Sequence, residues 1–331
     1  MRALLSHAKG GPDSLKIDEI DDPVPGAGEL LVAVKACSIN YPDWLIIQDL
    51  YQIRPERPFA PGSEIAGIVE AVGEGVTGFK PGDRVIAGTG FGGLVEKKLI
   101  AAASAYSLPD QFSFEQGASL LMTYGTSAHA LKDRGHIKAG DTLLVLGAAG
   151  GVGMAAVELG KAWGARVVAA VSSEEKAEAA RKIGADATVV YPHQPLDKDA
   201  SRALSQQFKD AVGANGADVI YDAVGGDYSE PALRSIAWEG RFLVVGFPAG
   251  IARLPLNLTL LKSCDVCGVF WGAFAAREPQ RNAGNIAELF DLWQQGKISP
   301  LVSETFPFER AAEAIQRLGE RKAIGKLVVT I

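Results

Sequence analysis

The feature that most constrains this chain is an apolar run that leads through a glycine-rich loop into a second apolar segment. Residues 142–146 read TLLVL, residues 147–153 read GAAGGVG, and helix-forming residues follow at once. A strand, a glycine-rich turn and a helix in direct succession are typical of a dinucleotide-binding unit. The segment therefore predicts a phosphate-binding loop at a helix N-terminus, which the alternative of a merely flexible turn explains less well.

Three small residues of this loop, Ala148, Gly150 and Gly153, occupy the positions that the motif reserves for glycine, with alanine at the first. Gly150 would let the backbone approach a pyrophosphate, and Gly153 would let the helix pack closely on the strand. Gly151 and Val152 lie at the start of the helix, where free N–H groups and the positive end of the helix dipole would face the phosphates.

Strands and helices alternate along the chain on the C-terminal side of this loop. We expect strands at 166–171, 187–191, 217–223 and 241–246, and helices at 173–183 and 199–212. Such alternation predicts a parallel, doubly wound α/β sheet with right-handed crossovers.

The ends of the chain have a different pattern. Residues 30–37 and 63–71 are short β-rich segments in a region cut by many glycines and prolines, which favours an antiparallel barrel or sandwich. The tail predicts helices at 283–295 and 309–318 and a last strand at 326–331. A chain of 331 residues is long enough for about two domains.

Composition excludes several classes of partner. The net charge of −6 provides no basic footprint for nucleic acid or anionic lipid. The chargeless stretch 143–157 is too short, and too rich in glycine, for a membrane span. The N-terminus has no apolar signal core, and Cys37, Cys264 and Cys267 cannot form a paired disulfide framework. We therefore expect a cytoplasmic protein without a membrane or nucleic-acid partner.

The residues after the second predicted strand indicate which nicotinamide cofactor fits. NAD-specific proteins place an acidic residue there to bind the ribose 2′-hydroxyl. This chain has Ser172 and Ser173, with Lys176 one turn later, and these side chains suit a 2′-phosphate. Glu174 and Glu175 are either a complication or ordinary charges in the first turn of a helix. The pattern favours NADPH.

Residues 140–153 (GDTLLVLGAAGGVG), with Lys161 after them, resemble the signature of the quinone oxidoreductase (zeta-crystallin) branch of the medium-chain dehydrogenase/reductase superfamily. Further matching segments are VKACSINYPD at 34–43, PGSE at 61–64, KPGDRV at 80–85, DAVGG at 222–226 and GK at 325–326. Glu158 departs from the signature, which usually has glutamine there, and we expect it to affect packing or surface.

The resemblance implies a fold and an assembly. It implies a GroES-like β-rich catalytic domain of residues 1–122 and 268–331, and a Rossmann domain of residues 123–267 with a doubly wound parallel sheet. Members of the branch are usually homodimers through the edge of the Rossmann sheet, so the resemblance also implies a homodimer.

Zinc-dependent members of the superfamily place a cysteine and a histidine ligand at the positions of Asn40 and Ser63. Neither residue here is a good zinc ligand. Cys264 and Cys267 have the spacing of a metal or redox pair, but one pair supplies two ligands at most, and buried strand positions explain the spacing as well. We expect a metal-free protein.

Asn40 and Tyr51 are the candidate catalytic residues. The 2-enoyl thioester reductases that resemble this chain have an asparagine and a tyrosine at the same separation, and the tyrosine there is the proton donor. Asn40 would donate amide N–H groups to a developing oxyanion, and Tyr51 would donate a proton. The alternatives are a turn residue for Asn40 and a packing aromatic for Tyr51.

The remaining predicted cofactor contacts rest largely on the resemblance. Residues 269–272 would line the nicotinamide, or would form an ordinary core strand, and Tyr191 would lie against the adenosine phosphate. The full set of predicted cofactor residues outside the glycine loop is Thr126, Ser172, Ser173, Lys176, Tyr191, Val224, Phe247, Phe270, Trp271, Gly272 and Lys326.

Three functions remain open on the sequence. The first is an NADPH-dependent reductase of quinones or α,β-unsaturated carbonyl compounds. The second is an enoyl- or acryloyl-thioester reductase, which needs a basic patch that Arg54, Arg57, Lys97 and Lys98 would supply. The third is a non-catalytic NADPH-binding protein.

Overall fold

The computed structural model describes residues 1–321 and 323–331 and contains two compact units. The first unit is Met1–Met122 with Pro300–Ile331, and the second is Thr123–Ser299. The sequence analysis placed the second boundary between the domains at 267/268, whereas these compact units divide at 299/300. The predicted domain boundaries stay a prediction.

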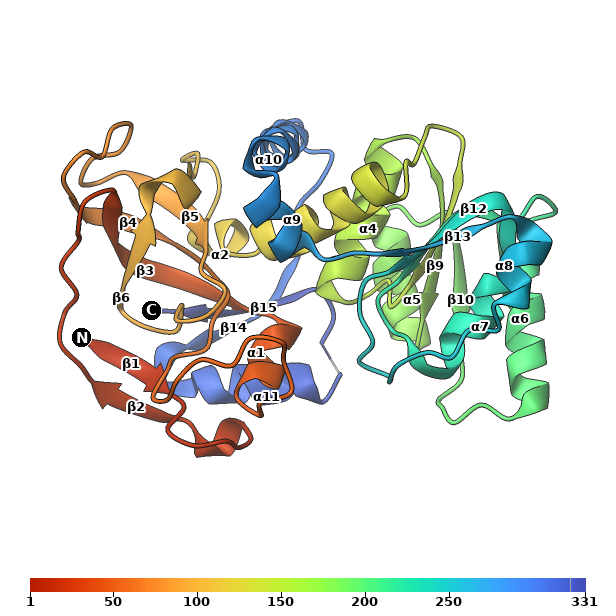
Figure 1. The fold of residues 1–331 in the computed structure, drawn as a ribbon, viewed down its shortest axis with the longest axis horizontal. Coiled ribbons are helices and arrows are strands. Elements are labelled where there is room, and N and C mark those ends of the chain that lie inside the picture. The colour runs from red at the N-terminus through yellow and green to blue at the C-terminus, as the bar shows by residue number, and fades with distance from the viewer. Residues whose placement is uncertain (322) are drawn as a thin grey trace. The chain divides into compact units, whose positions relative to one another are not determined.

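The first unit is built on a seven-stranded sheet in the order β14-β15-β3-β4-β5-β7, with β6 paired to β3 (Figure 1). All pairs are antiparallel except β14–β15. A separate hairpin is formed by β1 and β2. The strands are β1 (Arg2–Leu5), β2 (Lys16–Glu19), β3 (Glu29–Ile39), β4 (Glu64–Val72), β5 (Arg84–Gly88), β6 (Lys97–Ala101), β7 (Ala105–Ser107), β14 (Val302–Pro307) and β15 (Lys326–Thr330).

The α-helices of this unit are α1 (Tyr41–Ile46), α2 (Phe114–Gly117) and α11 (Ala311–Gly319). A Cβ atom on Gly319 would lie 2.4 Å from the Trp44 ring, so α1 and α11 approach closely only because position 319 is glycine. Ile46, Ile315 and Val329 share one buried core with the strands. This packing places the end of β3, the start of α1 and the start of β15 around one point.

The second unit is a six-stranded parallel sheet in the order β10-β9-β8-β11-β12-β13. This order is the doubly wound arrangement that the alternation predicted. The strands are β8 (Thr142–Leu146), β9 (Arg166–Val171), β10 (Ala187–Val190), β11 (Ala217–Asp222), β12 (Ile236–Val244) and β13 (Asp265–Gly268). The helices are α3 (Thr126–Ala128), α4 (Gly151–Ala162), α5 (Glu174–Lys182), α6 (Lys198–Val212), α7 (Ser229–Leu233), α8 (Asn257–Lys262), α9 (Trp271–Arg277) and α10 (Pro279–Gln294).

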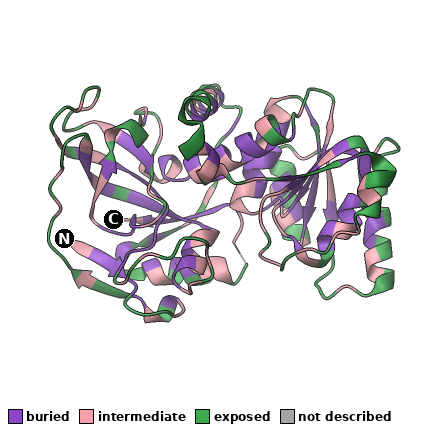
Figure 2. Ribbon diagram, in the orientation of Figure 1, coloured by how far each residue is buried: buried purple, intermediate pink, exposed green. Residues whose placement is uncertain are grey.

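The core of this sheet follows the alternation of side chains along each strand. Leu144 and Leu146 of β8 pack with Leu204 and Phe208 of α6, whereas Leu143 lies beside Gly160 of α4. Apolar side chains therefore cover both faces of β8, as expected for a central parallel strand. Figure 2 shows the strands of both sheets as mostly buried.

Two further segments are irregular. The π-helical stretches Leu121–Gly125 and His129–Arg134 lie on either side of α3. Residues 269–272 are not a core strand, because β13 ends at Gly268 and α9 begins at Trp271. Among the described residues, no helix is long and apolar enough to cross a membrane.

Candidate active site

The glycine loop forms a tight turn between β8 and α4. Gly147 has φ +73°, and a Cβ on Gly153 would lie 2.1 Å from the Gly147 carbonyl oxygen, so the fold itself requires glycine at both positions. Gly150 is the N-cap of α4, and a Cβ there would meet only the Gly147 oxygen, at 3.5 Å. The protein leaves open space at Gly150 that a bound phosphate group would fill.

The other predicted residues of the loop, at positions 148, 151 and 152, are buried or half-buried. Ala148 is fully buried, and Gly151 and Val152 form the first turn of α4. The Ser127 hydroxyl donates to the Val152 carbonyl at 2.8 Å.

Val224 and Phe247 are brought to the same end of the sheet. A Cβ on Gly147 would lie 2.8 Å from Val224 Cγ2, and one on Gly225 would lie 2.8 Å from Phe247 Cβ. The Asp222 carboxylate holds this turn, because its Oδ1 accepts the Val224 and Gly225 N–H groups at 2.9 and 2.8 Å. The carboxyl ends of β8, β11 and β12 therefore form one continuous edge.

The predicted 2′-phosphate residues lie together after β9. The Lys176 ammonium donates to the Ser172 hydroxyl at 3.2 Å, and the Ser173 hydroxyl accepts the Lys176 N–H at 3.3 Å as the N-cap of α5. Burial lowers the pKa of Lys176, and the Glu175 charge partly opposes this. Glu174 is one of the two acidic residues that complicate the choice of NADPH. Its carboxylate forms an ion pair with Arg181.

Tyr191, just beyond β10, is buried, and its ring centroid lies 4.5 Å from that of Tyr228. Trp271 lies against Gly125, since a Cβ on that glycine would be 2.8 Å from the indole, and its N–H donates to Asn282 at 2.9 Å. Thr126 is the next residue along the chain and begins α3. Phe270 precedes α9 with 57% of its surface exposed, and Gly272 lies in the first turn of that helix.

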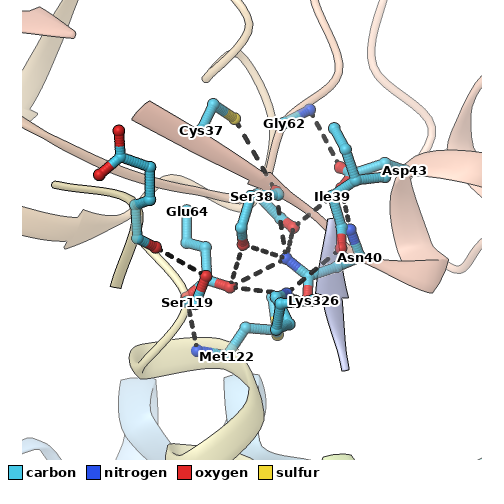
Figure 3. A network of polar contacts seen from close by, with 12 residues as sticks. Cys37, Ser38, Ile39, Asn40, Asp43, Gly62, Glu64, Ser119, Met122 and Lys326 are labelled. Carbon is cyan, nitrogen blue, oxygen red and sulfur yellow. Dashed lines mark hydrogen bonds and ion pairs between the residues drawn. The ribbon is translucent and has the colours of Figure 1, made fainter. Parts of the chain in front are cut away.

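In the first unit, Asn40 lies in a buried polar network rather than in an open pocket (Figure 3). Its Oδ1 accepts from the Lys326 ammonium at 2.6 Å. Its Nδ2 group lies 3.1 Å from both the Ser63 hydroxyl and Glu64 Oε1. Both amide protons therefore have acceptors inside the protein, and an oxyanion would have to compete with them.

Glu64 and Lys326 form the charged centre of this network. Glu64 Oε1 lies 3.2 Å from Lys326 Nζ and accepts the Ser38 hydroxyl at 2.5 Å, while Oε2 accepts the Met122 N–H at 2.9 Å. Lys326 Nζ also donates to the Ile39 carbonyl at 3.2 Å. The three ammonium protons thus have three acceptors, and both carboxylate oxygens are hydrogen-bonded.

A zinc ion does not fit this site. The positions where zinc-dependent relatives have ligands are Asn40 and Ser63, and the Lys326 ammonium already lies against the Asn40 oxygen. A second cation there would repel the ammonium at close range. Among the residues that the structure describes, no group of three or more histidine, cysteine or acidic side chains could hold a metal ion. Cys264 and Cys267 are buried free thiols.

Asp43 connects this network to α1. Its carboxylate accepts the Asn40 N–H at 2.7 Å, the Gly62 N–H at 3.0 Å and the Ser63 hydroxyl at 3.3 Å. Burial raises the pKa of Asp43 to about 6, although these hydrogen bonds lower it. Asn40 is thus the N-cap residue that precedes α1, and it also contributes its side chain to the network.

Tyr51 lies half-buried against the core of the first unit. Burial raises its pKa above the ordinary value, and the Asp43 charge raises it further. Its hydroxyl has no hydrogen-bond partner among residues 1–321 and 323–331. The structure does not join Tyr51 to Asn40 directly.

Glu64, Ser38 and Asp43 are site residues that the sequence analysis did not select. The signal for Glu64 was present, since it is an acid at the start of an otherwise apolar strand, SEIAGIVEA. A carboxylate that becomes buried needs a cation or several donors, so a search for its partner leads to Lys326.

The sequence of this chain matches known protein families and relatives. The alcohol dehydrogenase GroES-like domain family matches residues 26–110, and the zinc-binding dehydrogenase family matches residues 151–288. A quinone oxidoreductase-like protein 2 homolog of Nematostella vectensis is 36% identical over 99% of this chain and 88% of its own. The quinone oxidoreductase of Rattus norvegicus is 32% identical over 100% of this chain and 98% of its own.

A solved structure gives the same result. The Escherichia coli quinone oxidoreductase complexed with NADPH has a TM-score of 0.90 and 30% sequence identity, and covers 100% of both chains. The sequence resemblance and the predicted fold class are therefore confirmed: the chain is an oxidoreductase that belongs to the quinone oxidoreductase branch of the medium-chain dehydrogenase/reductase superfamily.

Proposed function

We propose that this protein is an NADPH-dependent reductase that transfers hydride to quinones or α,β-unsaturated carbonyl compounds. The observation that carries the proposal is the group of Ser172, Ser173 and Lys176 at the end of β9, beside a loop whose Gly150 leaves room for a phosphate. The similarity to a quinone oxidoreductase complexed with NADPH supports the choice of cofactor and acceptor.

NADPH would supply the hydride, and the chain would bind and orient it. The N–H groups of Gly151 and Val152 at the start of α4 would hold the pyrophosphate. Ser172 and Lys176 would hold the 2′-phosphate with hydroxyl and charge-assisted hydrogen bonds. Thr126, Val224, Phe247, Phe270, Trp271 and Gly272 would line the rest of the cofactor site.

Hydride addition to a conjugated acceptor leaves negative charge on a distant oxygen, which needs a hydrogen-bond donor and then a proton. Tyr51 suits this role better than Asn40. Its hydroxyl stays protonated because burial raises its pKa, and it has no partner among the described residues, whereas the Asn40 protons are engaged with Ser63 and Glu64. We assign Asn40 and Lys326 to organising the site.

The thioester alternative receives no support from the basic side chains that it needs. Arg57 pairs with Asp49 at 2.8 Å, and Lys97 pairs with Asp22 at 2.8 Å and with Glu70 at 3.1 Å. Lys98 lies over the Phe91 ring at 6.0 Å. Of the four candidates, only Arg54 has no partner among the described residues, and one exposed charge does not make a binding patch for coenzyme A phosphates.

One experiment distinguishes the three functions. Purified protein is mixed with NADPH and, in turn, benzoquinone, naphthoquinone, an enone and crotonyl thioester, and absorbance at 340 nm is followed. We expect turnover with quinones or enones. Turnover with the thioester alone would favour the alternative, and NADPH binding without turnover of any acceptor would favour a non-catalytic protein.

We also propose that the reaction needs no metal, because the Lys326 ammonium provides the positive charge at the position of the relatives' zinc. Incubation with a chelator should leave turnover unchanged. Activity that is lost to the chelator and restored by zinc would contradict this.

Finally, we propose a cytoplasmic homodimer that forms through the edge of the six-stranded sheet. Strand β13 is the edge strand, and the adjoining α8 exposes Leu260 by 78% and Leu261 by 63%. Exposed apolar side chains next to an open strand edge are typical of a subunit interface. Sedimentation should show a dimer for the native chain and a monomer for Leu260→Glu/Leu261→Glu. The three free cysteines fit a reducing compartment.

A further inference from the structure

A cavity lies in the Thr123–Ser299 unit, and none of the residues proposed for NADPH lines it. Its volume is about 1040 Å³, and it is bounded by α6, the start of α7 and two loops near residues 194 and 250. That volume is sufficient for an organic ligand of nucleotide size, since such pockets hold about 300–1,000 Å³.

The two loops that bound the cavity are joined to each other, so the cavity does not depend on an unsupported loop. Gln194 Nε2 donates to the Ala249 carbonyl at 2.7 Å, and the Gly226 N–H donates to the Gly250 carbonyl at 2.7 Å. Gly226 has φ +62°, and a Cβ there would lie 2.7 Å from the Ala249 oxygen. Glycine at this position permits the close approach of the two loops.

The acidic side chains around the cavity already have partners. Asp197 accepts the Ala200 N–H at 2.8 Å as the N-cap of α6, and Asp227 accepts the Leu196 N–H at 3.0 Å. Glu230 pairs with Arg234 at 2.5 Å. Asp197 and Asp227 keep their negative charge, so the five basic and three acidic side chains of the lining leave an excess of two positive charges.

Three basic side chains of the lining have no such partner. Lys198 and Lys209 of α6, and Arg253 of the second loop, make no ion pair or hydrogen bond with the residues that the structure describes. Arg202, also in the lining, has only a distant ion pair with Asp199 at 3.9 Å. The cavity wall thus carries an excess of unpaired positive charge.

These cations follow one face of α6, whose outer surface is largely exposed (Figure 2). Lys198, Arg202, Ser205 and Lys209 recur at spacings of four, three and four residues, which places them in one row on a helix. Lys198 and Lys209 are separated by roughly 16 Å along the helix axis, at 1.5 Å per residue. A single phosphate cannot contact both ends of this row.

Ser205 in the middle of the row gives an independent sign of a ligand. It lines the cavity, it is only 5% exposed, and its hydroxyl is the one buried side-chain polar atom without a hydrogen-bond partner among the described residues. Buried polar atoms nearly always have a partner.

We propose that this cavity is a binding site for a small molecule that carries two or more phosphate groups, separate from the NADPH site. Lysine and arginine side chains would neutralise phosphates along the row, and Ser205 would donate to a phosphate oxygen between them. The proposal does not depend on the proposed reductase function.

The test measures binding of inorganic tripolyphosphate to the full chain by calorimetry at low salt, and repeats it at saturating NADPH. Lys209→Ala/Arg253→Ala removes two cations from the cavity. Lys182→Ala/Lys297→Ala removes two exposed cations of the same unit that do not line it and serves as the matched control. Ser205→Ala removes the unpartnered hydroxyl and leaves the charge unchanged.

We expect tripolyphosphate to bind the native chain with and without NADPH. The cavity double variant should bind at least tenfold more weakly, the control double variant within twofold of the native chain, and Ser205→Ala severalfold more weakly. Absence of binding to the native chain, or an equal loss in both double variants, would overturn the proposal. Displacement of tripolyphosphate by NADPH would overturn it as well, because the anion would then occupy the phosphate loop.

Discussion

The ammonium of Lys326 lies 2.6 Å from the amide oxygen of Asn40, the residue that the sequence resemblance places at a zinc-ligand position. Glu64 completes the arrangement by accepting hydrogen bonds from both residues. A fixed side-chain cation therefore lies against the Asn40 oxygen and sets which way the amide points.

The first prediction concerns the stability of this ion pair. Lys326→Met or Glu64→Gln alone leaves one buried charge without its partner, so each should lower the free energy of unfolding by about 3–5 kcal/mol. The double variant Lys326→Met/Glu64→Gln should lose less than the sum of the two, because no uncompensated charge remains. Urea unfolding of the four proteins measures this coupling.

The exposed pair of Lys161 and Asp186 provides the control, with N···O 2.8 Å but about a third of each side chain in solvent. Lys161→Met should cost at most about 1 kcal/mol. If Lys326→Met cost no more than Lys161→Met, the buried pair would not support the fold.

The second prediction concerns the cofactor. Lys176→Ala removes a charge-assisted bond to the 2′-phosphate, so NADPH affinity should fall about ten- to a hundred-and-fifty-fold, which corresponds to about 1.5–3 kcal/mol. NADH affinity should change little, because NADH has no phosphate there. Fluorescence titration with both cofactors checks this, and equal affinities of the native chain for NADH and NADPH would refute it.

The third prediction concerns the proton donor. Tyr51→Phe should lower kcat with an enone about 10²–10⁴-fold, the usual contribution of a positioned acid. The effect with a quinone should be much smaller, since the hydroquinone anion is a weak base that water can protonate. NADPH affinity should not change. Unaltered enone turnover would make Tyr51 a packing residue.

The fourth prediction uses Glu158, the residue that departs from the family signature. Its carboxylate accepts hydrogen bonds from the Tyr124 hydroxyl and the Ser299 N–H, and burial raises its pKa from 4.5 to about 7. The folded chain therefore binds this proton more tightly than the unfolded chain. The free energy of unfolding should fall as pH rises from about 4.5 to about 7, by on the order of 3 kcal/mol, and this group should add no further change above that.

Glu158→Gln keeps the shape and the acceptor oxygen but does not titrate. Its stability should match that of the native chain near pH 4.5 and exceed it near pH 8. Denaturant unfolding at the two pH values measures the difference. Parallel stability profiles for the two proteins would show that Glu158 does not titrate in this range.

The sequence alone determined the features that depend on residues close together along the chain. The predicted strands 142–146 and 166–171 coincide with β8 and β9, and the small residues of the loop at 147–153 lie where the turn needs them. Apolar periodicity and the steric freedom of glycine act within a few residues, so both can be read from the chain. The strand β12 was placed less well: it begins at Ile236, five residues before the predicted start, and Ile236 pairs with Ala217 of β11 before a shift in register.

Only the tertiary structure decided how the polar residues of the first unit combine. Lys326 is 286 residues from Asn40 and 262 from Glu64, and no local pattern indicates that the three side chains share one buried site. The antiparallel register of β15 on β3, with Leu327 opposite Ile39, and that of β3 on β4, with Ser38 opposite Glu64, bring them together. Once buried there, a carboxylate and an ammonium must satisfy each other, because both are almost completely shielded from solvent. That requirement directs the Asn40 amide protons toward Ser63 and Glu64, whereas the sequence had suggested that they face a substrate.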